Sequence, residues 1–161
     1  MRAFRRGARP RAAVGLAPLA LVAAIVLSQV DHGPRALVGM PAANASPAQV
    51  VATYVRALDA HDFRTAERLL VPGVRETYRH TWFLDVDHVG SLTVGRVRAE
   101  RPSWSGRNHR TEVMRVPVRW DVKWRFVHRH SSLPEGRSTW GFWLSRTSDE
   151  KPWRIFDQGT D

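Results

Sequence analysis

The stretch MRVPVRWDVKWRF, residues 114–126, decides the fold. Apolar and polar residues alternate along its whole length, which is the period-two pattern of a β-strand with one buried face. Pro117 falls on the polar face, and because proline cannot donate a hydrogen bond to a neighbouring strand, it indicates an edge or an irregularity. We expect the following residues to face inward: Met114, Val116, Val118, Trp120, Val122, Trp124 and Phe126.

Further strands are predicted on both sides of this stretch. Leu92 and Val94 alternate with polar residues, the pattern then shifts to Val97 and Ala99, and Gly95 lies where a bulge would re-aim the side chains. After residue 126, two more inward rows follow: Trp140, Phe142 and Leu144, then Trp153 and Ile155. Loops over residues 101–109 and 128–136 separate these rows, so the sequence predicts about four antiparallel strands.

Two or three helices precede the strands. Ser46, Pro47 and Gln49 form the start signal of a helix over residues 48–60, because a serine N-cap, a proline at the first position and a glutamine three residues on make a capping box. Asp62 is the expected N-cap of a second helix, which ends at Pro72. A third short helix is predicted over residues 74–82, where a strand is the alternative.

Composition limits the possible functions. The chain has 161 residues, no cysteine and a formal net charge of +10. Without cysteine there is no disulfide, thiol catalysis, cysteine metal site or lipid attachment to a cysteine. The basic excess is interspersed with acidic residues after residue 46 and no nucleic-acid-reading motif accompanies it, so we expect no nucleic acid as a partner.

The amino-terminal third predicts a membrane protein. Residues 1–11 hold five arginines and no acid, and residues 12–30 hold no charge at all. At about 1.5 Å per residue the uncharged segment matches the hydrocarbon core of a bilayer, and the arginines place the N-terminus in the cytoplasm. We therefore expect a basic tail, a single-pass transmembrane signal anchor, a linker over residues 31–45 and an exported domain over residues 46–161. The alternative is a signal peptide cleaved near Ala45, which would release the domain as a secreted protein.

The exported part resembles the nuclear-transport-factor-2-like superfamily, which has a cystatin-like cone fold. Two segments carry the resemblance: PAQVVATYVRALDAHDFRTAERLL at residues 47–70, and KPWRIFDQG at residues 151–159. The resemblance implies an α+β fold in which two or three helices pack on a curved antiparallel sheet of about four strands. The superfamily includes ketosteroid isomerases and polyketide-cyclase-like proteins, but these motifs mark the scaffold and not an activity.

The cone of such a fold is a natural pocket. Large aromatic residues on inward rows either fill a core or line a cavity for a flat apolar ligand. The residues expected to line this space are Tyr54, Phe63, Trp82, Trp120, Trp124, Trp140 and Phe142.

Catalytic groups are few. The resemblance implies an acidic or histidine base against an apolar pocket, often with a tyrosine donor, and Tyr54 is the candidate donor. The inward row of residues 114–126 carries no acid or histidine, so the weak candidates for a base at the rim are Asp85, Asp87 and His88. His128 and His130 share one side of a segment, but we interpret them as surface histidines and expect no metal and no cofactor.

The polar face of the central strand is the candidate interaction surface. It carries Arg115, Arg119, Lys123 and Arg125, with Trp143 expected on the same face. It is either an ordinary solvated face or a docking face for an acidic partner, the membrane surface or a second copy. The sequence thus predicts a membrane-anchored, non-enzymatic interaction or accessory module of a bacterial envelope, with a small-molecule-binding or cyclase/isomerase-like enzyme as the alternative.

Overall fold

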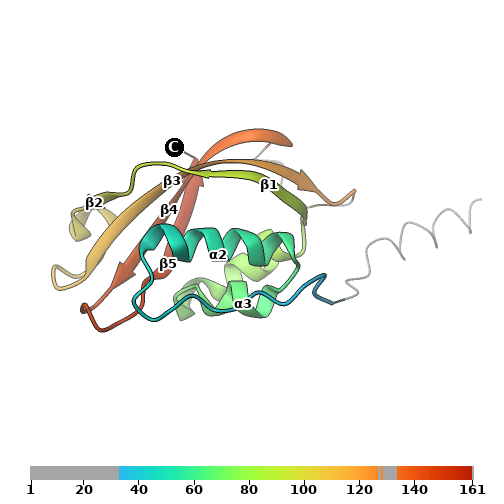
Figure 1. Cartoon of the computed structure of the whole chain (residues 1–161). Helices are drawn as coiled ribbons and strands as arrows, with labels where there is room; N and C mark the ends of the chain where they lie inside the picture. Colours follow the sequence, from blue (N-terminus) through green and yellow to red (C-terminus); the bar gives the residue numbers. More distant parts are fainter. Residues whose placement is uncertain (1–32, 127, 129–133, 161) are drawn as a thin grey trace, which may run out of the picture. The chain divides into compact units, whose positions relative to one another are not determined.

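The computed structural model describes residues 33–126, 128 and 134–160. The fold is α+β, with short helices packed on one face of a five-stranded antiparallel sheet (Figure 1). The helices are α2 (Pro47–Asp59), α3 (Phe63–Arg68) and α4 (Arg75–Tyr78). They are accompanied by the 3-10 turns η1 (Pro72–Val74) and η3 (Pro102–Ser105) and the π-helical turn η2 (Arg79–Phe83). The strands are β1 (Val86–Val94), β2 (Arg98–Glu100), β3 (Glu112–Trp124), β4 (Gly136–Arg146) and β5 (Arg154–Thr160).

The predicted membrane anchor at residues 12–30 lies outside the described residues. Among the helices that the structure describes, none is long and apolar enough to span a bilayer.

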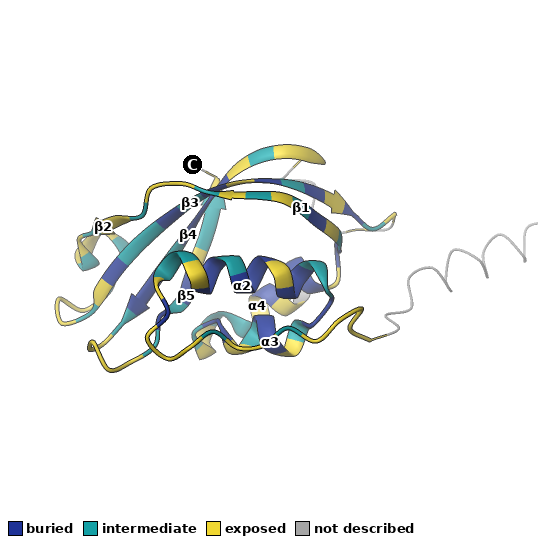
Figure 2. Cartoon of the chain, in the orientation of Figure 1, coloured by how far each residue is buried: buried dark blue, intermediate teal, exposed yellow. Residues whose placement is uncertain are grey.

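Strand β3 lies at the centre of the sheet. The strand order is β1-β3-β4-β5, and β2 pairs with β3 beyond the end of β1. Val116, Val118, Trp120, Val122 and Trp124 are buried while their neighbours are less so, and this alternation is visible along the strands in Figure 2. The prediction was wrong at Phe126: β3 ends at Trp124, and Phe126 is 82% exposed.

Pro117 lies in this central strand because its neighbouring strand is interrupted. The carbonyl oxygen of Pro117 accepts a hydrogen bond from the backbone N–H of Gly95 at 2.8 Å. In a strand the N and O of one residue point to the same neighbour, so the missing N–H of Pro117 also faces this side. Residues 95–97 separate β1 from β2 there, so the missing N–H faces a segment that belongs to neither strand. The predicted strand thus becomes two strands, and the register shifts of β1 lie between Val86 and His88 and between Gly90 and Thr93 instead of at Gly95.

The helix start signals are confirmed. Ser46 caps α2, with its side chain accepting from the Gln49 N–H while the Gln49 side chain accepts from the Ser46 N–H. Asp62 caps α3 by accepting from the Thr65 N–H at 3.2 Å. Between the two helices, His61 adopts a left-handed conformation with φ 55°.

This conformation ends α2 in a Schellman motif. The N–H of Asp62 donates to the carbonyl of Ala57 and the N–H of His61 donates to that of Leu58, which are the two bonds that define the motif. A glycine usually occupies the left-handed position, and here a histidine does.

The segment before α2 is attached to the domain. Residues 33–45 form no helix or strand, yet the Arg35 N–H donates to the carbonyl of Ala60, the Val38 N–H donates to the Asp62 carboxylate, and the Thr65 hydroxyl donates to the Val38 carbonyl. We call this segment the strap. The strap belongs to the same folded unit as the helices and the sheet.

Candidate functional site

Aromatic rings fill the space between α2 and the sheet. Trp82 is at the centre of the group, with its ring centroid 5.6 Å from that of Trp120, 5.3 Å from Trp124 and 5.4 Å from Trp140. The ring centroid of Phe142 lies 5.5 Å from that of Trp120 and 5.7 Å from that of Tyr54, so Phe142 connects these two residues. Six of the seven residues expected to line a pocket therefore contact one another as a packed core.

The seventh residue, Phe63, is separate from this cluster. Its ring stacks between those of His61 and Phe83, at 5.4 and 5.2 Å. Phe63 thus belongs to the end of the domain where α2 stops and β1 starts.

Tyr54 has a buried hydroxyl. The residue is fully buried, and burial, with a smaller contribution from Tyr78, raises its pKa far above the ordinary value. The Gln158 side chain is close enough to lower that pKa slightly, but no atom of it reaches good hydrogen-bond geometry with the hydroxyl. At neutral pH the hydroxyl keeps its proton, so Tyr54 can donate a hydrogen bond but cannot act as a base.

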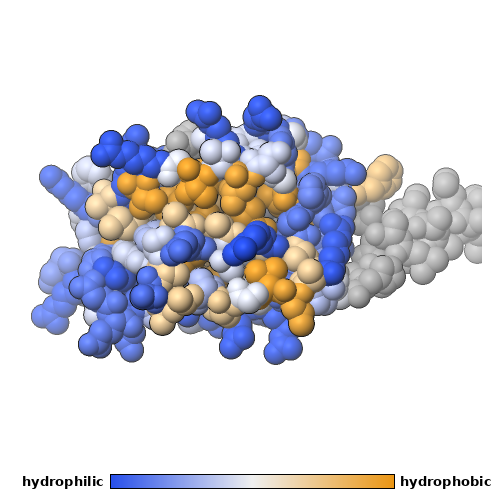
Figure 3. All heavy atoms as spheres, viewed as in Figure 1, coloured by the Kyte–Doolittle hydropathy of each residue, from blue (hydrophilic) through white to orange (hydrophobic). Residues whose placement is uncertain are grey.

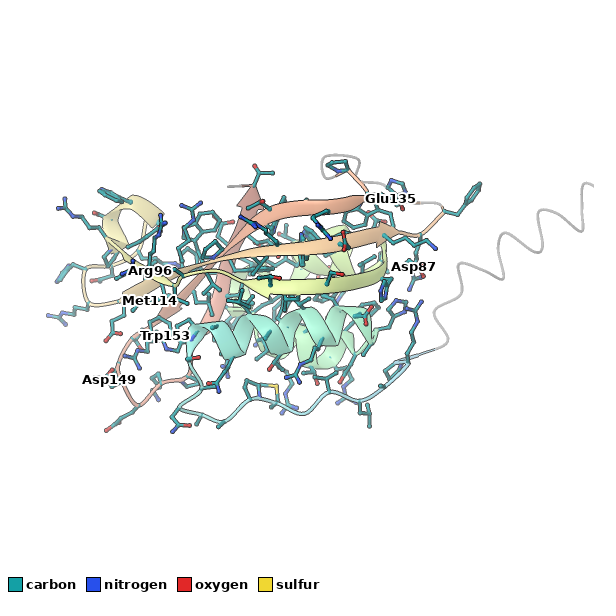
Figure 4. All side chains as sticks on the ribbon, turned by 45° about the horizontal axis from the view of Figure 1, so that its top comes forward. Asp87, Arg96, Met114, Glu135, Asp149 and Trp153 are labelled. Atoms are coloured by element: carbon teal, nitrogen blue, oxygen red, sulfur yellow. The ribbon has the colours of Figure 1, made fainter. Side chains whose placement is uncertain are left out.

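Two of the three candidate bases, Asp87 and His88, make their contacts away from the aromatic cluster. The Asp87 carboxylate is paired with Arg35 at 2.9 Å and with Lys123 at 3.7 Å, and Figure 4 shows Asp87 at the end of the domain where the strap begins. The His88 imidazole contacts the Asp59 carboxylate, and Asp85 is buried with its backbone carbonyl bonded to the N–H of Arg125. The side chains of Asp87 and His88 therefore join the strap, α2 and the sheet.

The outer face of the sheet carries three of the four expected cations. Arg115, Arg119 and Lys123 alternate with the buried residues of β3 and so lie away from the helices. Arg119 is exposed and lies between Thr93 of β1 and Thr139 of β4.

Arg125 lies elsewhere, because it follows the end of β3. Its Nε donates to the carbonyl of Val86 at 3.3 Å, and its Nη2 lies 3.4 Å from Nδ1 of His61. Arg125 therefore belongs to the junction between α2 and β1 and not to the outer face.

Trp143 is held flat on the outer face. Its Nε1 donates to the Glu100 carboxylate at 2.9 Å, and the Arg115 guanidinium lies 5.0 Å from the ring centroid. The ring lies beside Gly141, where an added Cβ would be 3.0 Å from it. A partly exposed indole fixed by neighbouring charges is typical of protein interfaces.

Sequence reasoning missed two surface features. The first is a band of partly buried apolar side chains from β1, the segment after it and β3, formed by Leu92, Val94, Val97 and Met114. Apolar surface is visible between the sheet and α2 in Figure 3. The second is a hollow lined by cations beside the β4–β5 turn. Alternation placed the four apolar residues on inward rows but did not indicate that they form one partly exposed band, and no pattern brings the cations together, because each feature combines residues from separate segments.

Within the described residues no three histidine or acidic side chains gather in a way that could hold a metal ion. His128 stacks on Trp124 with centroids 6.0 Å apart, and the other histidine of the predicted pair, His130, lies outside the described residues. Comparisons of the chain with protein-family models, curated proteins and solved structures give no match.

Proposed function

We propose that the chain is a membrane-anchored, extracytoplasmic interaction or accessory module without enzymatic activity, built on a nuclear-transport-factor-2-like cone. The observation that carries this proposal is the packed aromatic cluster around Trp82. A cone that catalyses a reaction needs space for a substrate beside a group that can exchange a proton. Here rings pack next to Tyr54 and Trp120, and two of the candidate bases, Asp87 and His88, contact other charged or titratable side chains away from this cluster.

Two surfaces support an interaction role. The outer face presents Arg119 and the fixed indole of Trp143, and the sheet edge presents the apolar band. Exposed apolar patches rimmed by polar residues are typical of protein contacts. The partner would be another envelope protein, or a second copy of this chain, that brings acidic groups to the outer face.

The anchoring proposal rests on residues 1–30. Their uncharged segment and preceding arginines predict one span with the N-terminus in the cytoplasm. Cleavage near Ala45 remains the alternative, and would release the domain.

The absence of cysteine in the sequence allows a direct test in cells. Full-length Arg119→Cys, on the outer face, and Arg64→Cys, on exposed α3, each carry a single thiol. We expect a membrane-impermeant maleimide to label both in intact cells, and a thiol-directed cross-linker to capture a partner from Arg119→Cys only. Labelling that requires opened cells would contradict the topology. Equal cross-linking of both variants, or of neither, would contradict the proposed face.

One observation favours the alternative of a small-molecule-binding or cyclase/isomerase-like protein. The Tyr54 hydroxyl, the Trp140 Nε1 and the Gln158 carboxamide are buried, and no described residue provides them with a hydrogen-bond partner. Unpaired buried polar groups are costly in a purely structural core. A ligand that hydrogen-bonds to them would be bound more weakly by Tyr54→Phe.

A further inference from the structure

The hollow beside the β4–β5 turn is lined by four cationic side chains from different parts of the fold. It has a volume of about 340 Å³. Arg107 comes from the segment between η3 and β3, Arg146 from the end of β4, Lys151 from the turn and Arg154 from the start of β5. Hydrophilic side chains gather at this end of the domain in Figure 3, and Figure 4 marks it by Asp149 and Trp153.

Acidic neighbours neutralise only one of the four cations. Arg146 is bonded to the carboxylates of both Glu112 and Asp149. Among the residues that the structure describes, no carboxylate forms an ion pair with Arg107, Lys151 or Arg154.

Two of the arginines are held in place by aromatic rings. The Arg107 guanidinium lies 4.1 Å from the ring centroid of Phe156, and that of Arg146 lies 4.6 Å from the ring centroid of Trp153. Phe156 and Trp153 are both buried. Because stacking fixes a guanidinium plane, these two side chains lose little freedom when a ligand binds.

Arg154 is partly buried and lies near two further cations, Arg75 and Arg68. Burial lowers the pKa of Arg154, and the nearby charges of Arg75 and Arg68 lower it further. Arg154 donates one hydrogen bond to the carbonyl of Trp153. A half-buried guanidinium beside two more cations would be stabilised by a bound anion.

From this arrangement we propose that the hollow binds a phosphate-bearing anion. Guanidinium groups match phosphate oxygens in a bidentate geometry, and an ammonium adds a point charge. Thr111, Thr147 and the buried Ser145 also line the hollow and provide hydroxyl groups, which complete a typical phosphate site. The phosphate is either free in solution or part of a phospholipid headgroup. Both sources present the same phosphate group to the hollow. This proposal does not depend on the interaction role of the outer face.

Isothermal titration calorimetry on the full chain in nonionic detergent tests the proposal with two probes. Pyrophosphate represents a free anion, and glycerophosphoglycerol represents a phospholipid headgroup. Arg154→Gln removes a partly buried cation, and Lys151→Gln removes an exposed one whose loss leaves the core intact. Arg137→Gln is the control, because it removes the same charge from a side chain that is 79% exposed and does not line the hollow.

We expect saturable binding of at least one probe. Loss of a charge-assisted contact should weaken binding about 10-fold in Arg154→Gln and about 3-fold or more in Lys151→Gln, with no change in Arg137→Gln. The probe that binds identifies the source of the phosphate. Lack of saturable binding by both probes, or equal weakening in Arg137→Gln, would overturn the proposal, since the second result would indicate general charge attraction.

Discussion

The Nε2 atom of His61 lies 2.9 Å from the backbone carbonyl oxygen of Asp87, so the residue that ends α2 also holds the start of β1. A carbonyl oxygen only accepts hydrogen bonds, so Nε2 carries the proton and Nδ1 accepts from Arg125. These contacts offset the left-handed backbone of His61, which costs a residue other than glycine about 1–2 kcal/mol.

Substitution of His61 should separate the backbone cost from the side-chain contacts. His61→Ala keeps the unfavourable φ and loses both hydrogen bonds, so it should lower the free energy of unfolding by about 2–3 kcal/mol. His61→Gly loses the same contacts but tolerates the conformation, and it should be about 1 kcal/mol more stable than His61→Ala. Urea unfolding followed by tryptophan fluorescence measures both. An alanine variant more stable than the glycine variant would contradict the Schellman assignment.

Tyr54→Phe should leave the free energy of unfolding unchanged or raise it by up to about 1 kcal/mol, because it removes a buried hydroxyl that has no hydrogen-bond partner among the described residues. Ser138→Ala is the matched comparison. The Ser138 hydroxyl accepts from Nε1 of fully buried Trp120 at 3.1 Å, and its removal should cost about 1–3 kcal/mol. Equal destabilisation by both substitutions in urea unfolding would mean that Tyr54 has a structural partner.

Asp62 should make stability depend on pH in the acid range. Burial by itself raises the pKa of its carboxyl, but hydrogen bonds from Val38 and Thr65, with the charge of Arg64, outweigh burial and hold the pKa below the ordinary 3.8. A depressed pKa contributes stability that is present above 3.8 and is lost as the pH falls through the folded-state value.

Asp62→Asn should therefore be about 1–2 kcal/mol less stable than wild type at pH 7, and this difference should shrink at acidic pH. Asp149→Asn, in an exposed turn, should have little effect at any pH. Urea unfolding at a series of pH values provides the test. A difference between Asp62→Asn and wild type that stays constant down to the lowest pH would refute the assigned role of Asp62.

The strap should contribute to folding. A fragment starting at residue 46 lacks the Arg35–Asp87 ion pair, the Val38–Asp62 hydrogen bond and the buried Ala45. It should be about 2–4 kcal/mol less stable than a fragment starting at residue 33. Thermal unfolding by circular dichroism compares the two. Identical melting temperatures would show that the strap is a passive linker, as its composition predicts.

Sequence patterns predicted those structural elements that depend on interactions between residues close together in the chain. The capping box at Ser46 and Gln49 and the N-cap at Asp62 each involve neighbouring residues, so the sequence was enough to find them. The predicted strand ended in the wrong place because alternation continues to Phe126, whereas pairing with β4 stops at Val122 and pairing with β1 stops at Trp124.

The candidate site was less predictable than the fold. Arg125 has the same sequence period as Arg115 and Arg119, but the end of β3 takes it to the α2–β1 junction. Arg107, Arg146, Lys151 and Arg154 come from separate segments, and nothing in their spacing indicates that they line one hollow.

The sequence by itself determined the α+β class, the central strand, the caps of α2 and α3, and the charge and hydropathy patterns, because these depend on residue type and short-range spacing. Tertiary structure decided whether the aromatic rows enclose a space or fill one, and which cations have acidic neighbours. Those properties depend on contacts between residues far apart in the chain. The packing of Trp82 from η2 against Trp120 and Trp140 from the sheet is such a contact.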